Sequence, residues 1–139
     1  MNYKYYINII DSIFSPLKPG GQLITEKWRF DLTIALAGSL GILMMEVDGR
    51  GSWGQGLKWH KLLVGHIGDL DVQDQLSGLS YVIRKYHVDT SKVGVMGSEY
   101  GGYLAIKMMT NSRGGGDIIS CALLKSPVID WTIHGMYWC

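Results

Sequence analysis

One glycine pattern in the sequence is of the kind that holds a catalytic nucleophile in enzymes. Gly97, Glu99 and Gly101 have the spacing of a nucleophile elbow, G-x-S-x-G, and they follow a short apolar run. The glycines are needed because the sharp turn brings the backbone and neighbouring strands too close together for side chains. Glu99 stands where the serine belongs, and Ser98 is out of register with the glycines. Without a serine, this elbow cannot form an acyl-enzyme through a Ser-His-Asp triad.

A catalytic role for Glu99 itself is the minor alternative. Carboxylates can attack alkyl carbons through an ester intermediate, but elbows of that kind use the shorter Asp, and a Glu reaches one methylene too far. We therefore interpret Glu99 as a residue without a chemical role.

A second glycine loop, Asp48–Gly56, follows another apolar run and has the G-x-G-x-x-G spacing of a dinucleotide-binding loop. Asp69, about twenty residues further on, begins a predicted helix, whereas the acidic residue of that fold ends a strand. Trp53 would also crowd a pyrophosphate. We favour a structural loop anchored by Arg50 and Trp53, and a dinucleotide-binding domain remains the remote alternative. The glycines of the spacing are Gly49, Gly51 and Gly54.

The elements that must position these loops alternate between strands and helices. Short apolar runs predict strands at 41–47, 92–96 and 118–124, and helical periodicity predicts helices at 25–37, at 69–86 and from the elbow to about residue 110. Such alternation indicates an α/β fold with a parallel sheet and right-handed crossovers. Both glycine loops then lie at the carboxyl ends of strands, where functional groups collect in such sheets.

The predicted helix boundaries depend on capping residues. Thr25 is a candidate N-cap for the first helix, and Gly38 is the candidate glycine after its end. In the second helix, Asp69 and Asp71 lie near the positive end of the helix dipole.

Composition excludes several classes of function. The 139 residues suit one domain, and 13 basic against 12 acidic residues, without a basic cluster, argue against a nucleic-acid partner. Cys121 and Cys139 have neither disulfide-framework nor metal-ligand spacing, so we expect no metal and no cofactor. The N-terminal residues are expected to make a poor signal peptide, and no run approaches the roughly 20 apolar residues that a membrane helix needs.

Several ordered motifs resemble the prolyl oligopeptidase family, specifically the α/β-hydrolase domain of its dipeptidyl peptidase branch. They are similar, in order, to the family's PGSQ-x-x-T-[DE]-K-F, DGRGS, G-x-x-E-V-x-D-Q, G-W-S-Y-G-G-Y and [SA]-P-[IV]-[TS]-D. The matching segments are Pro19–Trp28, Asp48–Ser52, Gly68–Gln75, Gly97–Tyr103 and Ser126–Asp130.

This resemblance implies a partial α/β-hydrolase fold, with a mostly parallel sheet and helices on both faces. Residues 19–139 would form the N-terminal part of the domain, truncated before the family's triad Asp and His, and 1–18 stay unassigned. If it is cut after its third predicted strand, the sheet exposes an edge, so we expect poor solubility or oligomerisation of the chain expressed alone.

The family's site residues carry over only in part. Glu99 occupies the nucleophile position, and the Tyr100 backbone N–H is the one oxyanion-hole donor carried over by position, because the family's oxyanion-hole tyrosine falls near Pro16. Asp117, Asp130 and His134 come too early in the chain to be the triad Asp and His. The elbow would be shaped by Gly97, Gly101 and Gly102, and the family loop would consist of Asp48, Gly49, Arg50, Gly51 and Ser52.

Within the branch, the likeness is greatest to the non-peptidase members, the dipeptidyl aminopeptidase-like proteins. It implies a catalytically silent auxiliary subunit of voltage-gated potassium channels, which also forms homo- or hetero-dimers. It further implies a location on the extracellular side of the plasma membrane, within a type II membrane protein. The alternative is a serine-type dipeptidyl peptidase, if Glu99 reflects a sequence error and the chain is a fragment.

Overall fold

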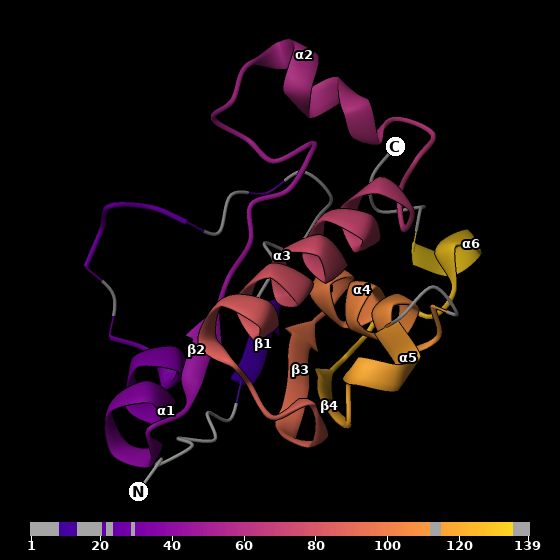
Figure 1. The fold of residues 1–139 in the computed structure, drawn as a ribbon. Helices are drawn as coiled ribbons and strands as arrows, with labels where there is room; N and C mark the ends of the chain where they lie inside the picture. Colours follow the sequence, from indigo (N-terminus) through magenta and orange to yellow (C-terminus); the bar gives the residue numbers. More distant parts are fainter. Residues whose placement is uncertain (1–8, 14–20, 22–23, 29, 112–114, 135–139) are drawn as a thin grey trace, which may run out of the picture.

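The chain folds around a four-stranded parallel sheet. The computed structural model describes residues 9–13, 21, 24–28, 30–111 and 115–134. The strands lie in the order β2-β1-β3-β4, all parallel, as the alternation of elements predicted (Figure 1). They are β1 (Ile9–Ile13), β2 (Leu43–Met45), β3 (Val93–Ser98) and β4 (Cys121–Lys125).

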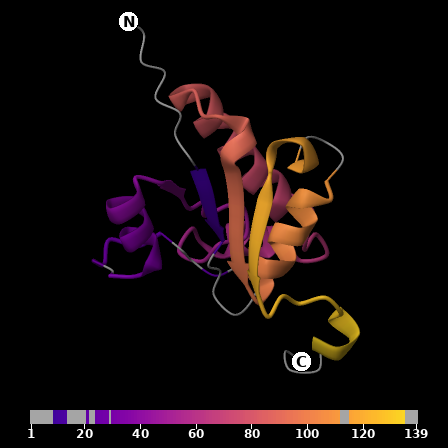
Figure 2. The same ribbon diagram turned by 90° about the horizontal axis from the view of Figure 1, so that it is seen from below.

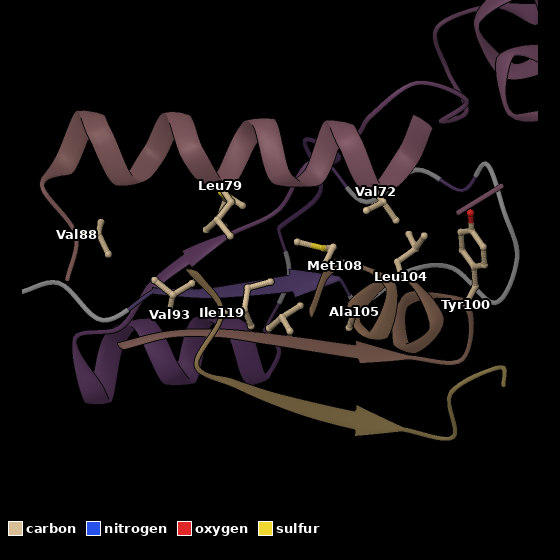
Figure 3. Close-up of a cluster of buried hydrophobic side chains, with 11 residues drawn as sticks. Val72, Leu79, Val88, Val93, Tyr100, Leu104, Ala105, Met108 and Ile119 are labelled. Carbon is tan, nitrogen blue, oxygen red and sulfur yellow. The ribbon is translucent and has the colours of Figure 1, made fainter. Parts of the chain in front are cut away.

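Helices cover both faces of the sheet, which confirms the predicted architecture. The long helix α3 and helix α4 lie on one face, and α1 lies on the other (Figures 2 and 3). The α-helices are α1 (Leu32–Leu40), α2 (Leu57–His60), α3 (Leu70–Tyr86), α4 (Tyr100–Met109), α5 (Gly115–Ile118) and α6 (Trp131–His134). Two 3-10 turns, η1 (Lys61–Leu63) and η2 (Thr90–Lys92), complete the elements of the described residues.

The core lies between β3 and the two helices α3 and α4. Leu79, Val93 and Met108, from these three elements, are completely buried (Figure 3). Burial of a side chain of this size stabilises the fold by about 1.5–3 kcal/mol. The core therefore fixes α4, and with it the elbow at its beginning, against the end of β3.

Helix α3 agrees with its prediction to within one residue. It runs from Leu70 to Tyr86 with Asp69 at the N-cap position, and its apolar stripe includes the buried side chains of Val72 and Leu79. The strong 3.6-residue periodicity of this segment corresponds to the face that contacts the core.

Helix α1 was predicted to begin too early and to end too early. Its N-cap is Asp31, whose side chain accepts a hydrogen bond from the Ile34 N–H, and it ends at Gly41 in the left-handed region, with φ 62°. Trp28, an apolar residue within the predicted helix 25–37, is 84% exposed. The cap at Thr25 and the end at Gly38 are therefore wrong, because no packed face selects that register.

Strand β1 lies in the segment 1–18, to which no element was assigned. It pairs with β2 through Ile9 and Leu43, and with β3 through Ile9 and Val93. Among the described residues, the sheet therefore has four strands and not three. Strand β4 also begins later than predicted, at Cys121, because α5 takes up residues through Ile118.

Candidate functional site

The elbow is a turn made by one residue. Strand β3 ends at Ser98 and helix α4 begins at Tyr100, so Glu99 alone reverses the chain direction. Its backbone has φ 51° and ψ −113°, a conformation rarely adopted by a residue with a side chain. Strain at such a position costs on the order of 1–3 kcal/mol and persists only where the surroundings impose it.

The neighbours of the elbow glycines explain how the turn is imposed. A Cβ atom added to Gly97 would lie 2.3 Å from the carbonyl oxygen of Gly101. A Cβ atom added to Gly102 would lie 2.8 Å from the Cβ of Pro127. Both distances are far below normal contact, so β3, α4 and the segment after β4 come together only because these positions lack side chains.

Backbone hydrogen bonds also hold Glu99 in place. Its N–H donates to the Lys125 carbonyl at 3.0 Å, and its carbonyl accepts from the Val128 N–H at 3.1 Å. The side chain is half-buried, and no described residue donates a hydrogen bond to its carboxylate. The elbow therefore presents a carboxylate in the place where the motif usually presents a hydroxyl.

The oxyanion-hole position is at the first residue of α4. The N–H groups of the first helical turn have no partner within the helix, so the Tyr100 N–H is free of the α4 hydrogen-bond ladder. Pro16, near which the second donor would fall, lies outside the described residues.

The remaining acid and base candidates lie on other elements. Asp117 lies in α5 and His134 in α6. The Asp130 carboxylate accepts from the Thr132 hydroxyl at 2.6 Å and from its N–H at 2.8 Å, and these bonds lower the pKa of Asp130. Among the described residues, no hydrogen bond joins these side chains to Glu99. Within the described part of the chain there is also no group of three or more metal-binding side chains.

Sequence reasoning missed a buried contact directly beside the elbow. The Tyr100 hydroxyl donates a hydrogen bond to the Asp71 carboxylate, which also accepts from the N–H groups of Gly68 at 3.2 Å and Val72 at 2.9 Å. Burial raises the pKa of Tyr100, and the nearby negative charge of Asp71 raises it further. Asp71 therefore joins the beginning of α3 to the beginning of α4. The sequence offered one signal of this contact: Asp71 stands at the position of the Glu in the family motif G-x-x-E-V-x-D-Q.

Aromatic side chains surround this contact. The ring of Tyr103 lies 6.0 Å from that of Tyr100 and 5.2 Å from that of Trp131, measured between centroids. Trp131 is also 5.9 Å from the His134 ring. A Cβ atom on Gly68 would meet the Tyr103 hydroxyl, so the beginning of α3 closes one side of the cluster.

The second glycine loop is held by an ion pair with α3. The Arg50 guanidinium donates to the Asp74 carboxylate from Nη2 at 2.7 Å and from Nε at 3.0 Å. The Arg50 backbone N–H donates to the same carboxylate at 2.6 Å. These side-chain hydrogen bonds raise the pKa of Arg50. Arg50 is therefore an anchor of this loop, as the sequence indicated.

The glycines of this loop face protein atoms. A Cβ atom on Gly49 would lie 2.8 Å from the Cβ of Asp74, and one on Gly51 would lie 2.1 Å from the Cγ of Leu63. Because the Arg50 backbone N–H donates its hydrogen bond to the Asp74 carboxylate, that N–H is not available to a pyrophosphate. The loop geometry therefore gives the dinucleotide hypothesis no support.

Trp53 is 64% exposed, and its ring meets the His60 ring edge-on with 5.3 Å between the centroids. Trp59 holds the loop through a hydrogen bond, because its Nε1 donates to the Gly49 carbonyl at 3.2 Å. Asp48 holds the loop from its other end, since its carboxylate accepts from the Ile24 N–H at 2.9 Å. Ser52 is buried after this turn, and its N–H donates to the Gly49 carbonyl at 3.2 Å.

The profile of the Prolyl oligopeptidase family matches residues 28–137, which is most of the chain. The chain belongs to the prolyl oligopeptidase family. Its curated relatives include the inactive dipeptidyl peptidase 10 of Rattus norvegicus, 27% identical over 117 residues, and the probable dipeptidyl-aminopeptidase B of Paracoccidioides lutzii, 32% identical over 116 residues. Each match covers 84% of this chain.

The solved structures agree with this prolyl oligopeptidase assignment. The dipeptidyl peptidase 4 of Porphyromonas gingivalis superposes with a TM-score of 0.81 and 25% identity, over 94% of this chain and 18% of that one. The α/β-hydrolase fold predicted from the sequence is thereby confirmed. The chain spans only 14% of the rat relative and 12% of the fungal one, so it corresponds to one part of these longer proteins. No described helix is both long and apolar enough to cross a membrane.

Proposed function

We propose that this chain is a catalytically silent dipeptidyl-peptidase-like domain that acts by contacting other proteins. The observation that carries the proposal is Glu99 at the apex of the elbow, with the strained backbone of a nucleophile position but no serine hydroxyl. A relative that bears the word inactive in its name is consistent with it. The similarity to probable dipeptidyl-aminopeptidases supports the alternative, a serine peptidase, which requires a serine at position 99.

The absence of peptidase activity is tested in two ways. The chain is incubated with Xaa-Pro-nitroanilide substrates to detect cleavage, and with a fluorophosphonate probe to detect labelling of a reactive serine. We expect no cleavage and no labelling, because the elbow offers no hydroxyl nucleophile. The Ser98→Ala variant is the matched control for the neighbouring hydroxyl. Cleavage by the unmodified chain that a serine inhibitor blocks would overturn the proposal.

The Glu99→Ser variant tests whether the chain lacks only the nucleophile or also the other residues of a catalytic triad. We expect it to remain inactive, since a serine hydroxyl needs an adjacent base. Turnover by this variant would show that a base and its partner are already in place, and would favour the peptidase alternative.

We further propose, on the resemblance, that the partner is a voltage-gated potassium channel subunit, contacted on the extracellular side of the plasma membrane. The test is co-expression of the chain with an A-type channel, followed by co-precipitation and recording of the current. We expect the chain to bind the channel and change its inactivation, and Glu99→Ala to behave as the unmodified chain does. Absence of both effects would reject the channel role and leave catalytic silence as a separate question.

A further inference from the structure

A groove of about 740 Å³ lies between α3 and α4, whose positions Figure 1 shows. Its volume is within the range of small-molecule sites in proteins. Both helices that form its walls are fully described, and most of the side chains along them are polar or charged. The lining residues are Gly68, Asp69, Gln73, Leu76, Ser77, Ser80 and Arg84 on the α3 side, and Lys107, Thr110 and Asn111 on the α4 side.

One end of the groove is basic. Arg84 lies in the last turn of α3 and Lys107 in the last turn of α4. The two helices run in the same direction, because each returns from the carboxyl end of a strand in a parallel sheet, so these two turns lie at the same end. Among the described residues, no carboxylate pairs with either cation. Two cations on facing walls favour an anionic group between them.

The rest of the groove offers mainly hydrogen-bond acceptors. The Ser77 hydroxyl donates to the Gln73 carbonyl at 2.7 Å, and the Thr110 hydroxyl donates to the Ile106 carbonyl at 2.9 Å. The oxygen of each hydroxyl therefore remains able to accept. At the far end, the Asp69 carboxylate accepts from the Gln73 amide at 2.8 Å and has further lone pairs. A matching ligand combines one anionic group with several hydroxyl donors.

We propose that this groove binds a sugar that carries a phosphate or sulfate ester. The ester lies between Arg84 and Lys107, and hydroxyl groups of the sugar donate to Ser77, Thr110 and Asp69. An acidic peptide fits less well, because the Asp69 carboxylate would repel its negative side chains. This binding does not involve Glu99, so it is independent of the proposed catalytic silence and of the channel role.

The first test is isothermal titration calorimetry of the chain with ribose 5-phosphate, glucosamine 6-sulfate and glucose. We expect saturable binding of at least one ester and none of glucose, and the tighter ester identifies which anion the groove prefers. Added salt should weaken the binding, since charge attraction contributes to it. Failure of both esters to bind, or equal binding of glucose, would overturn the proposal.

The second test removes the cations one at a time. We expect Arg84→Gln and Lys107→Gln each to raise the dissociation constant about tenfold, since each removes a hydrogen bond to a charged group. Lys85→Gln is the matched control. Lys85 is next to Arg84 but is not part of the lining, and its ammonium lies over the rings of Tyr81 and Tyr86. Equal weakening by all three variants would show non-specific charge attraction and reject the site.

The third test fills the groove without changing its charge. Ser80 is a half-buried lining residue, so we expect Ser80→Leu to abolish binding and Ser80→Ala, which leaves the space open, to retain most of it. Urea denaturation shows whether each variant is folded. Undiminished binding by folded Ser80→Leu would place the ligand elsewhere. If Ser80→Leu does not fold, the comparison of Arg84→Gln with Lys85→Gln still decides the proposal.

Discussion

The elbow and the Asp48–Ser52 loop both begin at the carboxyl ends of strands, and both contain glycines that other residues could not replace. At the elbow, the obstacle to a side chain on Gly97 is backbone, the carbonyl of Gly101. In the loop, the obstacles are side chains, Asp74 beside Gly49 and Leu63 beside Gly51.

The elbow and the Asp48–Ser52 loop are therefore held in place by different kinds of contact. The elbow is shaped by contacts of its glycines with the backbone of α4 and with Pro127, none of which involves the side chain of residue 99, so it keeps the geometry of a nucleophile turn whichever side chain that residue carries. The loop is shaped by side chains from α3 and the segment before it, so it depends on the chemistry of those side chains. This explains how a hydrolase elbow can persist in a chain without its nucleophile.

The largest expected effect is that of Gly97→Ala. The added methyl would meet a carbonyl held inside α4, which cannot move without breaking the helix, so we expect a loss of more than about 4 kcal/mol of stability or a failure to fold. Urea denaturation followed by circular dichroism measures it.

Gly38→Ala is the matched control. Gly38 lies inside α1 with no atom near its Cβ position, so alanine should stabilise the chain by roughly 0.5–1 kcal/mol. If Gly97→Ala unfolded at the same urea concentration as the unmodified chain, the backbone contact would not be what fixes the elbow.

A smaller effect is expected for Asp74→Ala in the loop. The substitution removes the acceptor of the Arg50 backbone N–H and guanidinium, and since both side chains are partly exposed we expect a loss of about 2–3 kcal/mol. A double-mutant cycle with Arg50→Met, measured by urea denaturation, isolates the ion-pair contribution.

Asp69→Ala tests whether the loss of stability depends on the position of the carboxylate on α3 and not on its negative charge alone. Asp69 is an exposed carboxylate near the beginning of the same helix, so its removal should cost less than about 1 kcal/mol. Equal losses for the two aspartates would indicate a general effect of charge at the beginning of α3.

A smaller effect than that of Asp74→Ala, about 1.5 kcal/mol at neutral pH, is expected for Tyr100→Phe, which removes one of three donors to Asp71. Because the pKa of Tyr100 is raised in the folded chain, the unfolded chain releases this proton first, above about pH 10. The contribution of Tyr100 is therefore complete below that pH and decreases above it.

The measurement is the difference in unfolding free energy between the chain and Tyr100→Phe at neutral and alkaline pH. We expect the difference to become smaller as the pH rises above about 10. A difference that stayed constant or grew would contradict the raised pKa.

Local patterns in the sequence predicted the elements around the elbow well. The periodicity of α3 comes from one continuous helix face, and the apolar run before Gly97 is a fully buried strand. The glycine spacing predicted a sharp turn at Glu99 because the cause of that turn, the absence of side chains, is itself visible in the sequence.

Contacts between distant segments could not be predicted in the same way. The hydrogen bond from Tyr100 to Asp71 depends on how two helices are placed, and no local pattern encodes it. Strand β1 contains Asp11 and Ser12 within a short segment, so its place between β2 and β3 is determined by pairing partners far along the chain. The first residues of α1 were misplaced because apolar residues such as Trp28 face solvent.

The central position of β1 has a consequence for the order of folding. Ile9 leaves the ribosome before both of its neighbours across the sheet, Leu43 and Val93. Strand β1 must therefore wait for its second partner, β3, until the chain has been synthesised as far as Val93 and beyond. Pairings so distant in sequence slow folding and leave the waiting segment open to aggregation or to chaperones. The nascent chain is thus most vulnerable before the elbow has emerged.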